Sequence, residues 1–344
     1  FNICLIIAAV IIAPYYEAPI YVLAWGVLLA GFIQLLIQYF PLQTIEKLPR
    51  PKLNLKNEGL KKFFVLITPA LLAGGFTQIN LLIDTIYASL LETGSPTWLY
   101  VSDRLIQLPM GVFAIAVGIV LLPTLSKINL VDDKEKFINS LQNGQRFVLF
   151  IGIPSMIGLS FCAEDLISTI FLRGEFKEID VFQSSYSLLA FSCGLPFFML
   201  MKVLTPAFFA RKDTKTPMYI VLLGLILNVI LNYLLAFTFG LGHIGIAIGS
   251  SIAAAICVLI LELVLLRDGL INTKNILNRF NISILFSSIS IILFLHFFTA
   301  YTDFLSMPPL HRPFYLMIEV LSAVVIYFLV ARFIFGQSIT KAFS

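Results

Sequence analysis

The stretch Trp98-Leu99-Tyr100-Val101-Ser102-Asp103-Arg104-Leu105 places two opposite charges inside a long apolar run. The run continues to residue 124, and roughly 20 apolar residues are enough for a helix to span the hydrocarbon core of a bilayer. Arg104 therefore lies about six residues, or roughly 9 Å, inside a predicted membrane helix. A guanidinium at that depth costs about 2.5–3.5 kcal/mol. It is expected to face protein, a water-filled cavity or an anionic ligand.

The composition is typical of a polytopic membrane protein. Hydrophobic residues make up 59% of the chain and charged residues 12%, with a mean hydropathy of +0.96, whereas soluble domains have roughly 25% charged residues. The four cysteines lie in apolar runs without CxxC spacing, which favours small buried side chains over a disulfide or zinc site. The chain has three histidines and no Walker, HExxH or GxSxG motif, so neither an enzyme nor a nucleic-acid-binding protein is expected.

A GxGxxG pattern occurs at residues 240–245, but it joins two apolar runs and follows no predicted strand. A dinucleotide site is therefore not expected there. Gly245 and Gly249 instead indicate close packing of helices.

Ten apolar runs are predicted to be membrane helices, the first of them short. They are 1–14, 18–40, 63–91, 98–124, 147–172, 183–209, 218–239, 243–266, 281–299 and 314–331. Of the 23 Lys and Arg residues, 18 fall in one set of alternate connections together with the C-terminal tail, and 3 fall in the other set. The basic set, and with it the C-terminus, is therefore predicted to be cytoplasmic.

Two of the basic segments have patterns of their own. Residues 127–146 mix apolar and charged side chains in a way that suits a helix lying flat in the membrane interface, with a solvated connector as the alternative. Residues 41–61 are basic and contain prolines, which predicts a cytoplasmic linker between two helical bundles.

Polar residues inside the predicted helices are few, and three of them are predicted to meet. Asp84 has Asn80 one turn before it, and Asn228 and Asn232 share a face of another helix because they are four residues apart. Asp84 and Asn232 also lie at similar predicted depth. Converging carboxylate and amide oxygens suit Na⁺ or a proton relay. The alternative is a set of interhelical hydrogen bonds worth about 0.6 kcal/mol each.

Around Arg104, Tyr100 and Gln107 lie on the same helix face, and Asp103 and Gln107 form a pair four residues apart. Asp103 and Arg104 point about 100° apart, so they need not neutralise each other. Pro109 follows and permits a bend beside the charge. Arg104 therefore has two interpretations. It binds a ligand, or its side chain extends to the outer membrane interface.

Four further charged residues in or near the apolar runs have simpler interpretations. Lys202 is about two turns from the predicted cytoplasmic end of its helix, which favours extension of its side chain to the interface. Glu319 is expected to stay solvated, and Glu164 and Asp165 are expected at the surface of an outer helix end.

Several strings together resemble the MurJ/MviN family of lipid II flippases. They occur in the order and spacing of that family across most of residues 60–266. The strings are Gln78-Ile79-Asn80, Ala88-Ser89-Leu90, Gly94-Ser95, Ser102-Asp103-Arg104-Leu105, Leu121-Leu122-Pro123-Thr124-Leu125-Ser126, Gly174-Glu175-Phe176, Lys202-Val203-Leu204-Thr205-Pro206 with Phe208 and Phe209, and Arg211-Lys212-Asp213-Thr214-Lys215-Thr216-Pro217.

The resemblance implies an all-α, fourteen-helix fold of the MATE-like exporter superfamily, and the chain is expected to lack the first four helices. Residues 1–40 would then be the last two helices of the N-lobe, followed by the linker at 41–61. Residues 62–266 would form the six-helix C-lobe, and residues 281–331 a helix pair bordering a groove for the lipid tail. Without a complete N-lobe the fragment alone is not expected to transport.

For function, the resemblance implies a bacterial inner-membrane protein that flips a polyprenyl-diphosphate lipid by alternating access, with cell-wall synthesis enzymes as possible partners. Arg104 would bind the diphosphate, with Tyr100, Asp103, Gln107 and Lys202 around it. The chain departs from the family at Gln107, where an acidic residue is common. A Na⁺ site in some members resembles the Asp84, Asn228 and Asn232 grouping.

Other readings remain open from the sequence. A flippase for another polyprenyl-linked saccharide fits the same physics. A MATE-like cation-coupled exporter would favour acidic cavity residues, against which Arg104 argues, and a membrane scaffold would leave Arg104 unexplained.

Overall fold

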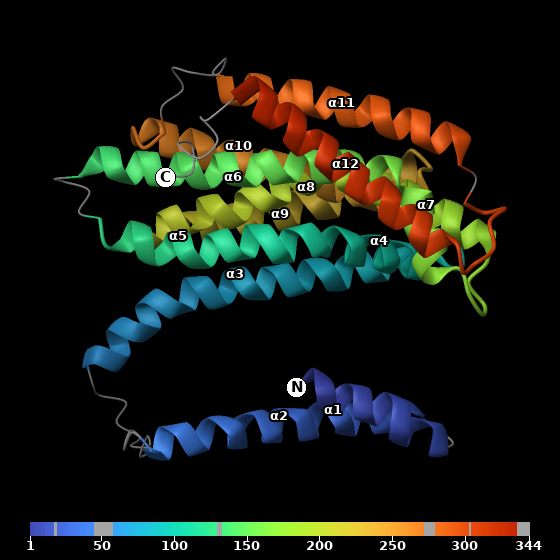
Figure 1. Cartoon of the computed structure of the whole chain (residues 1–344). Helices are drawn as coiled ribbons and strands as arrows, with labels where there is room; N and C mark the ends of the chain where they lie inside the picture. The colour runs from blue at the N-terminus through green and yellow to red at the C-terminus, as the bar shows by residue number, and fades with distance from the viewer. Residues whose placement is uncertain (17–18, 45–57, 129–132, 272–278, 303, 336–344) are drawn as a thin grey trace. The chain divides into compact units, whose positions relative to one another are not determined.

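A computed structural model describes the chain except for residues 17–18, 45–57, 129–132, 272–278, 303 and 336–344 (Figure 1). All regular structure in the described part is helical. Eight helices there are long and apolar enough to cross a membrane, and they correspond to eight of the ten predicted runs. A 32-residue helix and a short apolar one occupy the other two. The all-α polytopic prediction is confirmed.

The chain divides into two compact units, Phe1–Lys61 and Lys62–Ser344. The first unit contains α1 (Asn2–Ile7), a π-helical turn η1 (Ala8–Ile12), a 3₁₀ turn η2 (Ala13–Tyr15) and α2 (Pro19–Thr44). Helix α2 packs closely on η1, because a Cβ on Gly26 would lie 2.9 Å from the Cβ of Ala8. Most of the predicted linker lies outside the described residues, and the assignment of the two units to lobes stays a prediction.

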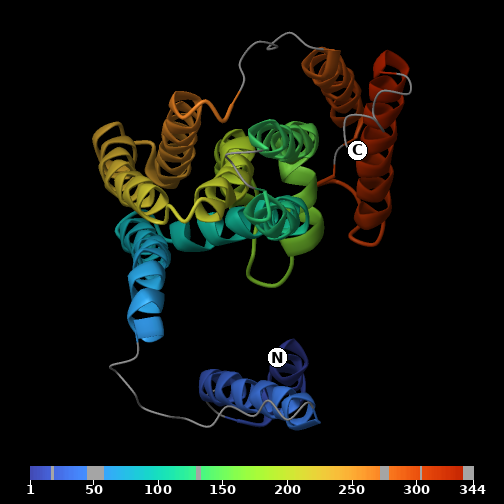
Figure 2. The ribbon, with the colours of Figure 1, turned by 90° about the vertical axis from the view of Figure 1, so that its left-hand side faces the viewer.

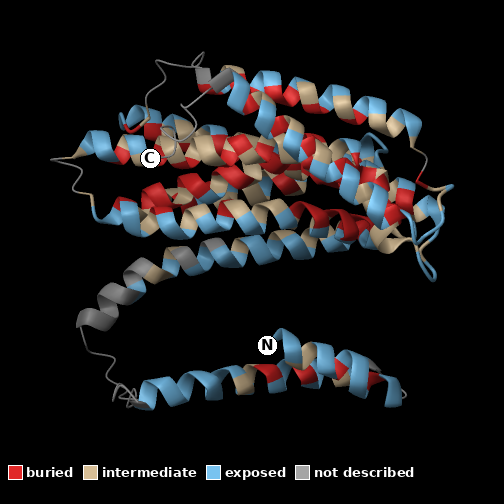
Figure 3. Cartoon of the chain, viewed as in Figure 1, coloured by how far each residue is buried: buried red, intermediate tan, exposed pale blue. Residues whose placement is uncertain are grey.

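The second unit is a bundle of long helices with one short helix at an end. It contains α3 (Glu58–Ser89, which begins just before the unit), α4 (Ser95–Pro109), η3 (Met110–Ile115), α5 (Ala116–Ser126), α6 (Lys134–Phe161), α7 (Ala163–Phe171), α8 (Glu178–Ala210), α9 (Lys215–Tyr233), η4 (Leu234–Thr238), α10 (Gly242–Arg267), α11 (Arg279–Tyr301) and α12 (Arg312–Phe335). Helix α8 is central, since α4, α5, α6, α7 and α10 all pack against it. Buried residues accordingly concentrate on α8 and α10, while α3 is largely exposed (Figure 3).

Helix α4 is fixed to α8 and α10 near its first turns. The Trp98 indole N–H donates to Asp180 Oδ1 at 2.8 Å, and its ring lies 4.8 Å from that of His243. One turn later the buried Ser102 hydroxyl lies 2.7 Å from the Ser184 carbonyl on α8. These contacts set the rotation of α4 about its axis, and therefore which face carries Arg104.

The predicted span at 98–124 contains the expected irregularity next to Pro109. The backbone changes there from α4 to the π-helical η3 and then to α5. Proline lacks an N–H and clashes with the preceding turn, which favours a local widening of the helix.

The prediction of a separate interfacial helix at 127–146 is wrong. Residues from Lys134 onward form the start of α6, which continues without interruption to Phe161. Two of the apolar residues that suggested an interfacial face, Phe137 and Leu141, are fully buried in the core of the bundle, and residues 130–131 lie outside the described part. The apolar stripe packs against neighbouring helices and not against lipid.

Two acidic residues that were expected at the surface are buried. Glu319 of α12 is fully buried and accepts a hydrogen bond from the Cys162 thiol, with 3.2 Å between sulfur and oxygen. Asp165, in the first turn of α7, is 8% exposed. Glu319 is buried because α11 and α12 form a pair that packs on α6 and α7 (Figure 2). The Tyr327 hydroxyl strengthens that packing by donating to the Phe150 carbonyl at 2.7 Å.

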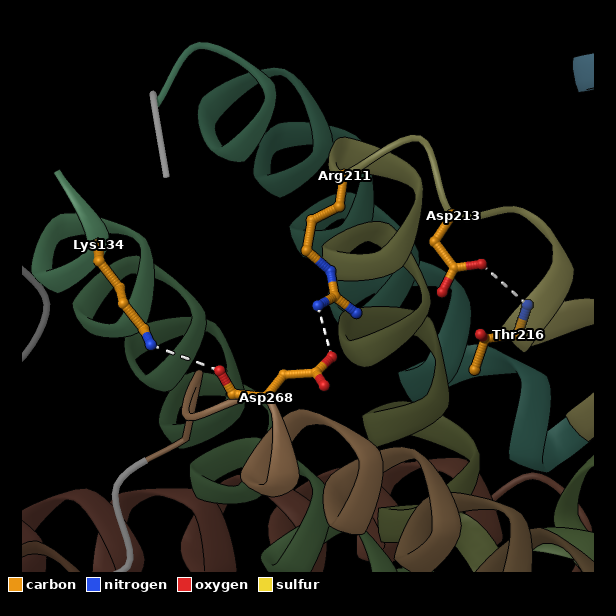
Figure 4. Close-up of polar contacts among 5 residues, drawn as sticks. All are labelled: Lys134, Arg211, Asp213, Thr216 and Asp268. Atoms are coloured by element: carbon orange, nitrogen blue, oxygen red, sulfur yellow. Dashed lines mark hydrogen bonds and ion pairs between the residues drawn. The ribbon is translucent and has the colours of Figure 1, made fainter. Parts of the chain in front are cut away.

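Polar contacts join the ends of α6, α8 and α10 on the side predicted to be cytoplasmic (Figure 4). The Arg211 guanidinium donates to Asp268 Oδ2 at 2.7 Å and stacks on Phe208, 4.9 Å from the ring centroid. The Lys134 ammonium donates to the Asp268 carbonyl at 3.4 Å. Asp213 accepts from the Thr216 amide at 3.0 Å and so satisfies one backbone N–H in the first turn of α9. One carboxylate-bearing residue, Asp268, thus links three helix ends.

The ion pair of Arg211 is predicted to stabilise the bundle more than a pair at the surface. Arg211→Gln should lower the free energy of unfolding by about 1 kcal/mol, because the Arg211 side chain is 16% exposed and its partner carboxylate would lose a charged donor. Thermal denaturation in detergent measures the effect. Lys136→Gln is the matched control, since the Lys136–Asp133 side chains are 71% and 44% exposed and such pairs contribute little. Equal destabilisation by both changes would contradict the role assigned to Arg211.

Candidate substrate and cation sites

Arg104 lies on the exposed face of α4 within a chain of polar contacts. Its Nη1 donates to Gln107 Oε1 at 3.2 Å, and its guanidinium carbon lies 4.7 Å from the centroid of the Tyr100 ring. The Gln107 amide in turn makes a short hydrogen bond to the Asp103 carboxylate. Gln107 therefore connects the two charges, and Tyr100 supports the guanidinium through a cation–π contact. The structure brings these four predicted residues together.

Asp84, Asn228 and Asn232 also meet, although they come from α3 and α9. Asn232 Nδ2 donates to Asp84 Oδ1 at 2.7 Å and lies 2.8 Å from Asn228 Oδ1. Asn80 Nδ2 reaches the other Asp84 oxygen at 3.1 Å. The Asn228 amide donates to Ser250 Oγ on α10 at 2.8 Å, which adds a residue that the sequence reasoning missed. We call these five residues the Asp84 cluster.

The Asp84 cluster is rich in acceptor oxygens. Asn232 is fully buried and Asn228 is 4% exposed. The Oδ1 atoms of Asn80 and Asn232 are buried and have no hydrogen-bond partner. Two unpartnered amide oxygens beside a carboxylate leave an excess of negative potential, which a small cation would offset.

Gly249 of α10 determines how closely the cluster is packed. A Cβ at this position would lie 2.1 Å from Asn232 Oδ1, so only glycine lets α10 approach the amide this closely. Gly245 has a similar role, because its Cβ would lie 2.6 Å from the Leu235 carbonyl carbon. The predicted close packing of Gly245 and Gly249 is confirmed.

A cavity of about 290 Å³ lies among α3, α4, α8, α9 and α10. Asn80 and Asn228 line it from the Asp84 cluster, and Asp103 lines it from the Arg104 side. Lys202 of α8 also lines the cavity and is itself exposed. Lys202 is therefore close to the polar interior of the bundle, and extension to the interface alone does not describe its position.

A second cavity, of about 400 Å³, is an apolar groove between the bundle and the α11–α12 pair. Leu108 of α4, Gly158 of α6 and Tyr327 of α12 are among the residues that line it. Leu108 is four residues after Arg104, so the two share a face of α4. A residue of the groove wall thus lies about one helical turn along α4 from Arg104.

The family model described as "Lipid II flippase MurJ" matches residues 1–312. The chain belongs to the MurJ family. A protein of Vibrio cholerae named "Probable lipid II flippase MurJ" is 42% identical over 269 residues, which are 78% of this chain and 50% of that protein. The protein of the same name in Haemophilus influenzae is 41% identical, over 74% of this chain and 51% of its own length. The chain thus spans about half the length of the curated relatives it matches.

Solved structures agree with the family. "Lipid II flippase MurJ, inward closed conformation" has a TM-score of 0.74 and 26% identity, over 98% of this chain and 66% of that chain. An outward-facing MATE multidrug transporter has a TM-score of 0.54 and 18% identity, over 68% of this chain and 54% of that one, and shows a shared fold alone. The chain is therefore a multi-pass membrane protein of a family of flippases and not of enzymes.

Gly249→Ala is predicted to disrupt the Asp84 cluster. The added methyl group would overlap Asn232 Oδ1, and overpacking of this kind costs typically 1–3 kcal/mol. A lower unfolding temperature in detergent checks the expectation. Gly75→Ala in α3 is the control, because a Cβ there meets nothing within 4 Å and alanine favours the helix. If Gly249→Ala were as stable as Gly75→Ala, the packing described for Asn232 would be incorrect.

Proposed function

We propose that this chain acts in flipping lipid II, the diphosphate-linked lipid precursor of peptidoglycan, across the bacterial inner membrane. The main structural support for this proposal is that one face of α4 combines Arg104 with Leu108, a wall residue of the apolar groove. A lipid with an anionic diphosphate and a long apolar tail needs both surfaces close together. Family membership supports the same assignment.

Arg104 would bind the diphosphate. A guanidinium carries five N–H donors in a planar fork, which suits two oxygens of a phosphate at once. The Tyr100 ring and the Gln107 amide hold the group in one orientation, which lowers the entropy lost when an anion binds. Asp103, linked through Gln107, prevents an uncompensated positive charge when no lipid is bound.

The groove between the bundle and the α11–α12 pair would hold the polyprenyl tail. Its walls are almost entirely apolar, as a hydrocarbon chain requires. Movement of the lipid would follow alternating access, with the C-terminus in the cytoplasm as the distribution of Lys and Arg predicts. An inside-negative potential favours outward movement of an anion by about 2.3 kcal/mol per charge per 100 mV.

The Asp84 cluster would bind Na⁺. One carboxylate with several amide and hydroxyl oxygens fits a monovalent cation in charge and in ligand hardness. Among the described residues there is no group of three His, Cys, Asp or Glu that could hold a metal ion. Inward movement of Na⁺ down its gradient would then help drive the cycle.

Arg104→Glu is predicted to abolish function. The charge reversal would repel the diphosphate, whereas Arg104→Lys should retain partial function because the charge remains and the two-pronged geometry is lost. Growth of cells depleted of their own lipid II flippase measures function, with each variant made in the full-length protein and its membrane level checked by immunoblot. Arg173→Glu, at an exposed arginine that bonds the Ile170 carbonyl on its own helix end, is the matched control. Normal growth with Arg104→Glu would reject the diphosphate-binding role.

Asp84→Asn is predicted to remove the response to Na⁺. Replacing the carboxylate with an amide takes away the one formal negative charge of the cluster while preserving its shape. Na⁺-dependent protection against thermal unfolding, measured in detergent with choline chloride as the reference salt, should disappear. Asp133→Asn at the surface should leave it intact. A full Na⁺ response in Asp84→Asn would place the cation elsewhere.

A further inference from the structure

The 290 Å³ cavity joins groups that the proposed mechanism otherwise treats separately. On one side it is lined by Asn80 and Asn228, both members of the Asp84 cluster. It is also lined by Asp103, which is bonded to Gln107. The rest of the lining is mainly apolar, and Lys202 adds a positive charge to it. The cavity thus brings charged residues next to the proposed cation site.

Two negative charges and one positive charge act on this space. Asp103 lines the cavity itself, and Asp84 is hydrogen-bonded to Asn80, which also lines it. Lys202 contributes the positive charge, and in the described part of the chain it forms no ion pair within 4 Å. In a low-dielectric bundle, an ammonium in a cavity beside carboxylates lowers the attraction that those carboxylates exert on any other cation.

Lys202 is also well inside its helix. It precedes the end of α8 at Ala210 by eight residues, or about 12 Å of helix. Its backbone is fixed, because a Cβ on Gly118 of α5 would lie 2.7 Å from the Lys202 carbonyl oxygen. The residue itself is exposed, so its flexible side chain can respond to charges at the surface of the bundle as well as to those in the cavity.

We propose that the Lys202 ammonium competes with Na⁺ for the negative potential at the Asp84 cluster. It thereby sets the affinity of the cluster for Na⁺ and couples Na⁺ binding to binding of the anionic substrate. This proposal rests on the proposed Na⁺ site. When the ammonium remains beside the cavity, it opposes entry of Na⁺. When an anion at the surface of the bundle attracts the ammonium, the negative potential of Asp84 and Asp103 is left for Na⁺. Binding of anion and of cation therefore favour each other.

The coupling works in both directions, because a change in cation affinity caused by the anion requires an equal change in anion affinity caused by the cation. Lys202 is thus a specificity-determining residue for the cation. Unlike a lysine that only extends to the membrane interface, it should alter Na⁺ binding when its charge is removed.

Na⁺ titrations of the purified protein test the proposal, with thermal unfolding in detergent as the readout. Lys202→Gln should tighten the apparent affinity for Na⁺ on the order of tenfold, as expected when one nearby unit charge is removed. Lys202→Arg keeps the charge and should stay near wild type. Lys215→Gln removes a lysine at the start of α9, outside the cavity, and is the control for a general change in net charge.

The outcomes separate the two proposals. If Asp84→Asn abolishes the Na⁺ response while Lys202→Gln leaves the affinity unchanged, or changes it no more than Lys215→Gln does, the role of Lys202 is rejected and the cation site stands. If Na⁺ has no effect on the wild type or any variant, the cation site is rejected and the role of Lys202 with it. A Na⁺ response that appears only in Lys202→Gln supports both.

Discussion

The structure depends on one constraint, which is that every charge inside an apolar bundle needs a partner or a neutralising surrounding. Asp84 receives hydrogen bonds from the amides of Asn80 and Asn232. Arg104 is connected to Asp103 through Gln107. The bond from Asn232 joins α9 to α3, so a contact that makes the Asp84 charge tolerable also determines how these two helices are arranged, whereas the Arg104 contacts lie within α4. Polar residues here are both fold determinants and candidate binding groups.

Helix α4 shows how packing converts that constraint into a binding surface. Its inner face is fixed by Trp98 and Ser102 against α8, which leaves Arg104 on the exposed face and Leu108 at the groove. A rigid inner face holds the guanidinium in place without burying it, so the group does not have to be reorganised when an anion arrives. This single helix therefore supports the proposal of a substrate with one anionic and one apolar part.

Much of this arrangement was predictable, because rare residues carry more information than common ones. Apolar runs located the helices, and the few polar residues within them identified Arg104 and the Asp84 cluster. The errors arise where tertiary packing overrides local pattern. The apolar stripe with Phe137 and Leu141 fits a lipid interface as well as a protein core, and only the contacts with neighbouring helices decide. Likewise, Glu319 is buried because α12 packs on α6 and α7, which its position near a helix end did not reveal.

The charges around the cavity also bear on how the membrane potential can act. Asp84, Asp103, Arg104 and Lys202 together carry no net formal charge. If this part of the bundle moves through the membrane field without ligands, those four residues contribute no net electrical work, since that work scales with net charge at about 2.3 kcal/mol per charge per 100 mV. The field would therefore act chiefly on the bound ions. A site that binds an anion and a cation together would move less charge than one that binds the anion alone, so under the proposed coupling Lys202 would also affect the electrical work of each half-cycle.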